Sequence, residues 1–164
     1  MVNFITKRVV LSMVVLISSV PFLFGQALNG NYVIGTGGNY ATVAAAVTAL
    51  NSNGVSGPVV FNIKNGTYTG RITINQITGA SATNTITFRG ESRTGTILTY
   101  SGSSGTDRAT VVLNGTDYIR FKNLTIQSTG ATYAMAVWAY NTANYNIFDS
   151  CNMIVPISTS SSYT

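Results

Sequence analysis

Residues 117–126 read DYIRFKNLTI, and residues 144–153 repeat the same pattern as NYNIFDSCNM. In both stretches Tyr comes second, Phe fifth, a small polar residue seventh and a residue suited to packing eighth. The Phe of this pattern recurs at positions 61, 88, 121 and 148. A repeat of about 20 to 50 residues is typical of stacked architectures, in which each unit buries its apolar face on the next. We therefore expect four side chains to point into one core from successive coils, namely Phe61, Phe88, Phe121 and Phe148.

Short β-type runs lie between the Phe positions, such as those at 72–74 and 111–113. They are separated by Gly, Asn, Ser and Thr, and the Asn65-Gly66 and Asn114-Gly115 pairs are strong turn signals. Each repeat therefore predicts two or three strands joined by turns. A Gly/Ser-rich stretch at 101–107 predicts the loop that makes the repeat between Phe88 and Phe121 longer than the other two. This part of the chain is predicted to be all-β.

The composition is poor in charge and lacks histidine. The length of 164 residues suits one domain, and 8% of the residues are charged, against about a quarter in typical soluble domains. The absence of His excludes Ser-His-Asp catalysis and His-based metal sites, and we predict no metal site and no cofactor. Cys151 is the only cysteine, so no intrachain disulfide can form. It occupies the position of Leu124 one repeat earlier, which favours a packing role over a reactive thiol.

The basic residues are spread along the sequence. Of the nine Lys and Arg residues, Lys7 and Arg8 precede an apolar run, which leaves seven basic and four acidic residues in the rest of the chain. The sequence shows no basic patch of the kind that neutralises phosphates. Nucleic acid is therefore not an expected partner.

Residues 1–27 have the layout of a secretory signal peptide. Lys7 and Arg8 precede the apolar run at 9–24, and Gly25-Gln26-Ala27 places small residues at the −3 and −1 positions of a cleavage site. The run is shorter than the roughly 20 residues that span a bilayer, although an uncleaved anchor is the alternative. We expect a mature chain that begins near Leu28 and is secreted or at the cell surface. Membrane contact is expected only through the signal peptide before cleavage.

Residues 28–56 are predicted to form an N-terminal cap that contains a helix. Asn39 is the expected N-cap, and Gly54 is a stop signal. An amphipathic helix laid across the end of a β-stack shields the apolar end from other chains. Its apolar stripe falls at the i, i+3, i+4 and i+7 positions, which are Val43, Ala46, Val47 and Leu50.

Residues 57–164 are predicted to be the first coils of the stack. The sequence shows no second capping element before its Ser-rich end at 158–164. We therefore expect the stack to be truncated at this end, and the remainder of the same chain to be a partner of the last coil.

The order of these features resembles the right-handed parallel β-helix of the pectin-lyase-like superfamily, and most closely the N-terminal half of pectin methylesterases. The matching pieces cover nearly the whole mature chain. They are GNYATV at 38–43 with the Ala-rich helix after it, GTY at 66–68, LTIQSTG at 124–130, and Ala136-Val137 with Cys151 downstream. The resemblance implies a parallel β-helix, or solenoid, with an N-terminal capping helix.

The esterase chemistry of that family implies two glutamines around an oxyanion, two aspartates and an arginine. By the resemblance, the place of the first glutamine falls on Met135 and that of the second near Ile157. The aspartates and the arginine would lie beyond Thr164. Since neither glutamine is present, we predict no catalytic residue within this sequence.

Trp138 and Tyr140 are the candidate carbohydrate-contact residues. If Met135, Val137 and Ala139 face inward, the two aromatic side chains form an exposed platform for a sugar ring. The resemblance favours the opposite alternation, because it places an outward residue at Met135, and that alternation would bury Trp138. The sequence leaves both alternatives open.

The charged residues favour structural roles. Asn62, Arg89, Lys122 and Asp149 each follow a repeat Phe, which predicts an outward column with an ion pair between Lys122 and Asp149. A glycosidase needs two carboxylates about 5–9.5 Å apart. The spacing of the acidic residues gives no reason for any two of them to meet.

Three functions are compatible with the sequence. The first is an exported β-helix protein that binds or processes a pectin-like polysaccharide, with any catalytic part beyond this sequence. The second is a non-enzymatic adhesin or structural stalk at the cell surface. The third is an intact pectin methylesterase, which the missing glutamines disfavour. If the full-length protein is an enzyme, a carbohydrate esterase, lyase or glycoside hydrolase is expected.

Overall fold

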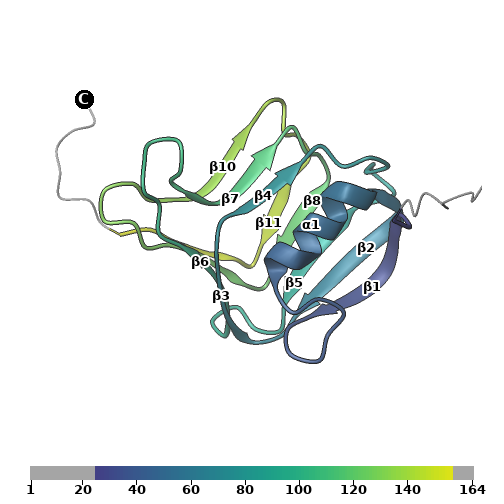
Figure 1. Cartoon of the computed structure of the whole chain (residues 1–164), viewed down its shortest axis with the longest axis horizontal. Coiled ribbons are helices and arrows are strands. Elements are labelled where there is room, and N and C mark those ends of the chain that lie inside the picture. Colours follow the sequence, from purple (N-terminus) through teal and green to yellow (C-terminus); the bar gives the residue numbers. More distant parts are fainter. Residues whose placement is uncertain (1–24, 157–164) are drawn as a thin grey trace, which may run out of the picture.

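The computed structural model describes residues 25–156, which form a coiled stack of short strands with one helix near the N-terminus (Figure 1). Residues 1–24, which are most of the signal peptide predicted at 1–27, and residues 157–164, which include the Ser-rich end, lie outside the described residues. The elements are β1 (Leu28–Ile34), α1 (Val43–Asn53), β2 (Val55–Ile63), β3 (Gly66–Thr69), β4 (Ile72–Asn75), β5 (Ile86–Gly90), β6 (Thr96–Tyr100), β7 (Ala109–Asn114), β8 (Ile119–Lys122), β9 (Thr125–Ser128), β10 (Met135–Tyr140), β11 (Ile147–Asp149) and β12 (Asn152–Ile154).

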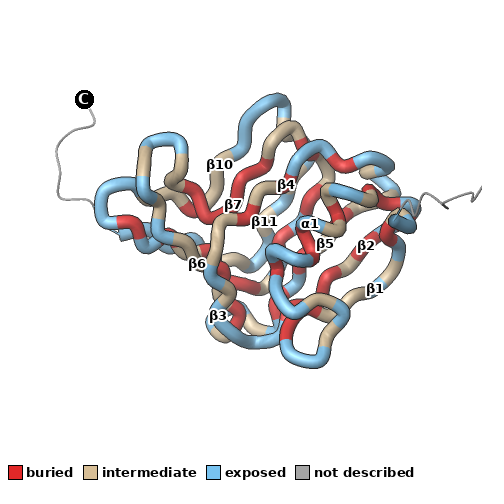
Figure 2. Tube along the Cα trace, in the orientation of Figure 1, coloured by how far each residue is buried: buried red, intermediate tan, exposed pale blue. Residues whose placement is uncertain are grey.

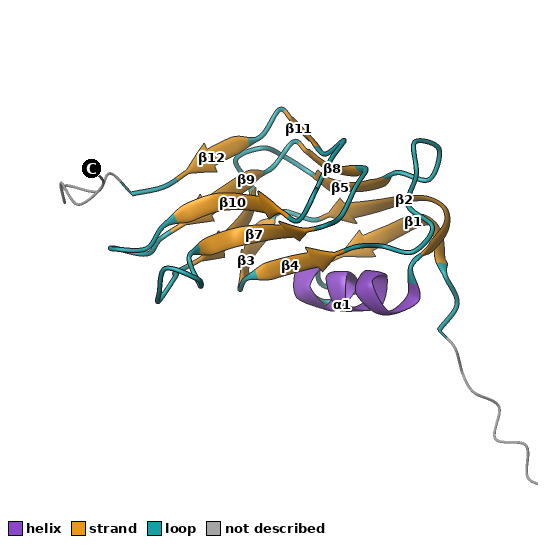
Figure 3. Cartoon of the chain, turned by 90° about the horizontal axis from the view of Figure 1, so that it is seen from above, coloured by secondary structure: helices purple, strands orange, loops and turns teal. Residues whose placement is uncertain are grey.

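The strands form three parallel sheets. Sheet A has the order β1-β2-β5-β8-β11, sheet B the order β12-β9-β6-β3, and sheet C the order β10-β7-β4. The chain passes from sheet A to sheet B to sheet C and then returns to sheet A one coil further along (Figures 1 and 3). Every strand therefore pairs with its counterpart in the next coil, and the all-β, right-handed parallel β-helix expected from the sequence is confirmed.

The repeat Phe residues form a continuous ladder inside the stack. Phe61 is in register with Phe88, Phe88 with Phe121, and Phe121 with Phe148. The ring centroids of successive pairs are 4.9, 5.2 and 5.3 Å apart, and the rings are stacked. Tyr32 on β1 extends the ladder, with its ring 5.6 Å from that of Phe61. The prediction of one core with one Phe per coil is confirmed.

Helix α1 covers the N-terminal end of the stack, where it packs against β4, β1 and β2. Its buried residues are those of the predicted stripe. The helix ends at Gly54, as predicted, but the expected N-cap at Asn39 is wrong. Thr42 is the N-cap, and its Oγ1 accepts a hydrogen bond from Ala45 N at 3.1 Å. Asn39 Oδ1 instead accepts a hydrogen bond from Val33 N at 2.8 Å, which fastens the preceding loop to β1.

Burial alternates along strands such as β2 and β8, whereas residues 109–113 of β7 are all buried (Figure 2). The inward residues of the earlier coils are buried, whereas most turns and the last coil are more exposed. In that last coil, Ile147 and Met153 are 46% and 50% exposed. No helix within residues 25–156 is long and apolar enough to cross a membrane.

Candidate functional site

The outer face of sheet C carries the aromatic residues that the sequence singles out. Ile72 and Val111, which are in register on β4 and β7, belong to the core. The alternate row, Thr73, Val112 and Trp138, therefore lies on the outer side, where Val112 is fully buried and Thr73 and Trp138 are partly buried. Because Trp138 is in register with Val112, the register supports the alternative in which Trp138 faces outward.

Met135 is the first residue of β10 and is only partly buried, whereas the next residue, Ala136, belongs to the buried core cluster. Met135 is in register with Ala109, and Val137 is in register with Val111 of the core. The resemblance puts an outward residue of the esterase at Met135. Met135 does not have the residue type that this role requires.

Two aromatic rings and a guanidinium group pack together on this face. The ring centroids of Trp138 and Tyr140 are 5.1 Å apart, with an angle of 35° between their planes. The Cζ atom of Arg108 lies 5.4 Å from the centroid of the Trp138 ring, within the range of a cation–π contact. Tyr140 is 37% exposed and Trp138 is half-buried. Since the guanidinium of Arg108 holds the indole from one side, the surface offers a fixed aromatic platform.

Beside this platform runs a row of asparagine side chains at the ends of β4, β7 and β10. Asn141 Nδ2 donates to Asn114 Oδ1 at 2.8 Å, and Asn114 Nδ2 donates to Asn75 Oδ1 at 3.0 Å. Asn114 is in register with Tyr140, so the amides adjoin the platform. They border a hollow of about 390 Å³ that is also lined by Gln76, Gly115 and Thr142. The row places amide groups, which can donate and accept hydrogen bonds with sugar hydroxyls, next to an aromatic surface.

The loop that leads into Arg108 is fastened by Asp107. One oxygen of its carboxylate accepts a hydrogen bond from Tyr100 Oη at 2.7 Å and another from Ser103 Oγ at 2.7 Å. The other oxygen accepts from Arg71 Nη1 at 3.0 Å. The hydrogen bond from Tyr100, followed by that from Ser103 and the charge of Arg71, lowers the pKa of Asp107. A carboxylate held ionised by three donors anchors the loop and is unsuited to deliver a proton.

The other carboxylates of the described residues also have structural partners. Glu91 accepts a hydrogen bond from Asn65 N at 2.8 Å, and Asp117 accepts one from Asn144 N at 2.6 Å. Within residues 25–156 no three His, Cys, Asp or Glu side chains gather into a possible metal site. The predicted ion pair between Lys122 and Asp149 is present, with a nitrogen–oxygen distance of 2.8 Å.

Cys151 lies half-buried in the last coil. Its thiol donates a hydrogen bond to the backbone oxygen of Asp149 at 3.4 Å, and burial raises its pKa. A thiol that stays protonated at neutral pH is a poor nucleophile, so the arrangement agrees with a packing role.

Two features of this face, Arg108 and the asparagine row, were not predicted from the sequence. Arg108 follows an irregular loop and falls in no repeat, so no local pattern links it to Trp138. The asparagine row left a partial signal, because Asn114 and Asn141 are separated by the same interval as Phe121 and Phe148.

Three parallel sheets wound from successive coils and closed by a helix define a protein of the parallel β-helix class. Among solved structures, the chain is similar to a pectin methylesterase in complex with a hexasaccharide, with a TM-score of 0.60 and 19% identity over 79% of this chain and 46% of that one. It is also similar to pectin methylesterase PemA from Erwinia chrysanthemi (TM-score 0.59, 19% identity, 79% of this chain and 46% of that one). A third similar structure is the pectin methylesterase from carrot (TM-score 0.59, 26% identity, 77% of this chain and 40% of that one).

These similarities establish the fold. The chain has the parallel β-helix fold of the pectin methylesterases, as the resemblance in its sequence implies. It spans 40–46% of the length of these three structures. No protein-family model matches the sequence, and no curated protein matches it.

Proposed function

We propose that this chain belongs to an exported protein that binds a pectin-like polysaccharide through the outer face of sheet C. The observation that carries the proposal is the outward Trp138, which is held by Arg108 and stands next to Tyr140 and the asparagine row. An aromatic ring flanked by amides suits a sugar ring, because the apolar face of the sugar stacks while its hydroxyls form hydrogen bonds.

Two further observations support this surface. The resemblance places the oxyanion residue of the esterases on β10, which is the strand of Trp138. One of the similar solved structures is a pectin methylesterase in complex with a hexasaccharide.

Binding without catalysis is the role that the described residues support. The Asp107 carboxylate, which lies nearest in sequence to Arg108 of this face, is engaged by three donors, and Met135 stands where the resemblance implies a glutamine. A non-enzymatic surface protein, such as an adhesin or stalk, is compatible with the same binding face. The unbroken Phe ladder supports that alternative, because it makes the stack a rigid spacer.

The proposed export rests on the signal-peptide pattern of residues 1–27. Gly25 and Gln26 are exposed and lie outside any strand or helix, as a protease site requires. The first strand, β1, begins at Leu28, directly after the expected cleavage point. Removal of residues 1–27 would therefore leave every described strand in place.

The experiment that tests binding uses the fluorescence of Trp138, which is the only tryptophan of the chain. Methyl-esterified pectin oligosaccharides are titrated into the purified protein, and we expect a saturable change in emission as a sugar ring covers the indole. Trp138→Ala should weaken binding, measured by calorimetry, by about thirtyfold, because a buried aromatic anchor contributes about 2 kcal/mol or more.

Tyr145→Ala is the matched control. Tyr145 is 70% exposed, but it lies in the turn before β11 and outside sheet C. Its substitution should leave the affinity unchanged. Affinity that stays unchanged in Trp138→Ala, together with binding that leaves the Trp138 emission of the wild-type protein unchanged, would refute this assignment of the face.

A further inference from the structure

The outer face of sheet A carries a group of cations that lies apart from the aromatic face of sheet C. Arg89 on β5 is in register with Lys122 on β8, and Thr87 is in register with Arg120. All three cations are exposed. We name Arg89, Arg120 and Lys122 the basic strip. Arg89 and Lys122 belong to the outward column predicted from the sequence, and stacking brings them side by side although they lie one repeat apart in the chain.

The charges of the strip are only partly neutralised. Lys122 has an anionic partner in Asp149, at 2.8 Å, but Arg89 and Arg120 form no ion pair with any residue of the described range. Like charges directly opposite each other on neighbouring strands destabilise a sheet. The pair of Arg89 and Lys122 is therefore unfavourable in the free protein and would be relieved by a bound anion.

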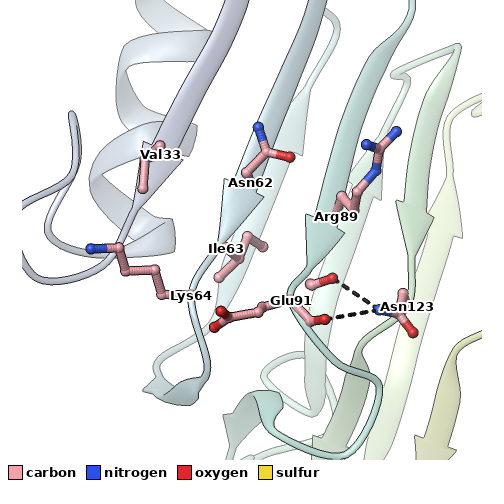
Figure 4. A pocket seen from close by; sticks show the side chains of 8 residues that line it. Val33, Asn62, Ile63, Lys64, Arg89, Glu91 and Asn123 are labelled. Carbon is pink, nitrogen blue, oxygen red and sulfur yellow. Dashed lines mark hydrogen bonds between the residues drawn. The ribbon is translucent and has the colours of Figure 1, made fainter.

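Arg89 lines two open hollows. The first has a volume of about 360 Å³, and Figure 4 shows Lys64 and Arg89 on opposite sides of it, with Glu91 at its lower edge. Lys64 Nζ is fixed by a hydrogen bond to Thr36 O at 2.7 Å, and Glu91 is engaged by Asn65 N. The second hollow, of about 330 Å³, is lined by Thr87, Arg89, Arg120, Phe121, Lys122, Ile147 and Asp149.

The geometry of the strip favours an extended ligand with repeated carboxylates. Neighbouring strands lie about 4.7–4.9 Å apart, so Arg89 and Lys122 repeat along the axis of the stack. A guanidinium group binds a carboxylate through two parallel hydrogen bonds. We propose that the basic strip binds a carboxylate-bearing polysaccharide that lies along the axis of the stack across sheet A. This surface is separate from the one in the proposed function and does not depend on it.

Nucleic acid fits this face less well. Affinity for nucleic acid comes from many phosphate contacts, and unpaired bases also require exposed aromatic rings for stacking. The strip has three cations, one of which is already paired. Phe121 is the only aromatic residue that lines either hollow, and its ring is buried in the ladder.

The test compares polygalacturonate oligosaccharides with fully methyl-esterified ones of the same length, by calorimetry at low and at high salt. The Arg89→Gln/Arg120→Gln variant should lose about tenfold or more in affinity for polygalacturonate, because charge-assisted hydrogen bonds are lost. The affinity of this variant for polygalacturonate should also depend much less on salt concentration than that of the wild type. Arg93→Gln is the control, since Arg93 is an exposed cation outside the lining of both hollows.

Asp149→Asn provides a test in the opposite direction. Removing the partner of Lys122 should raise the affinity for polygalacturonate, and a gain of binding cannot result from unfolding. The fluorescence response of Trp138 to esterified oligosaccharides should not change in the strip variants, which separates this surface from sheet C. Unchanged affinity in Arg89→Gln/Arg120→Gln would overturn the proposal. If the wild-type protein bound a single-stranded oligodeoxynucleotide as tightly as it binds polygalacturonate, the assignment of the ligand class would be overturned.

Discussion

The Phe ladder makes a quantitative prediction about stability, for which Phe121→Ala is the decisive change. Phe121 is 1% exposed, and its ring lies between those of Phe88 at 5.2 Å and Phe148 at 5.3 Å. The substitution removes one ring from the middle of the stack and leaves a cavity that the flanking strands cannot close. They cannot close it because β8 is hydrogen-bonded to both β5 and β11.

The expected cost is about 3–5 kcal/mol, the range for truncating a buried Phe to Ala. Two stacked contacts are lost at once, each worth about 0.5–1.5 kcal/mol beyond the burial of area, so the upper part of this range is expected. For a domain of this length, each kcal/mol corresponds to about 2–4 °C in Tm. Phe121→Ala should therefore lower the Tm by about 6–20 °C.

Thermal and urea unfolding, followed by circular dichroism, would measure this loss. Phe148→Ala is the internal comparison, because Phe148 is only half-buried and stacks on one described ring. It should cost clearly less than Phe121→Ala. Equal losses for the two variants, or a Tm within about 2 °C of the wild type for Phe121→Ala, would contradict a ladder stabilised by both neighbours.

Two further predictions concern the helix cap and the anchor of the loop at 101–108. Thr42→Ala should lower the free energy of unfolding by about 1 kcal/mol and speed hydrogen exchange at the Ala45 amide. Asn39→Ala should instead speed exchange at the Val33 amide. The reverse pattern of exchange would show that Asn39 is the N-cap. Because the pKa of Asp107 is lowered in the folded protein, its stabilising effect is present above the ordinary Asp pKa of about 3.9 and is lost as the pH falls through the lowered value. The Tm difference between the wild type and Asp107→Asn should thus be largest near neutral pH and shrink below about pH 4. A Tm difference that stays constant down to about pH 2.5 would show that the carboxylate does not stabilise the loop through its charge.

The fold was predictable because, in a parallel stack, the same type of residue recurs at the equivalent position of each coil. One Phe per coil marks the same inward position, so the intervals between successive Phe residues give the coil lengths directly. The residue after each Phe must then point outward, and the column from Asn62 to Asp149 is in register as expected. The N-cap could not be decided in this way. Asn39 and Thr42 are both good caps, and only the loop contact to Val33 determines which one is free for the helix.

The candidate site was predictable only in part, because its residues belong to no single repeat. Trp138 and Tyr140 are recognisable as alternating aromatic residues, but their direction depends on the pairing of β10 with β7. Arg108 reaches Trp138 from a loop of irregular length, and such loops carry no periodic signal. The inward or outward choice at Trp138 is a shift of one residue, and a one-residue shift reverses every side chain of a strand.

The two outer faces illustrate how a stack of this kind separates stability from recognition. Phe121 lies in the ladder, while Arg120 and Lys122, its neighbours in sequence, lie on the opposite side of the same strand. Because alternate residues face opposite sides, the surface residues can change without altering the packing of the core. Arg89→Gln/Arg120→Gln should therefore melt close to the wild-type temperature, and Phe121→Ala should keep its outer cations in register wherever the stack survives. If the strip variants lost as much stability as the ladder variant, the cations would contribute to the fold, and a binding role for them would lose its physical basis.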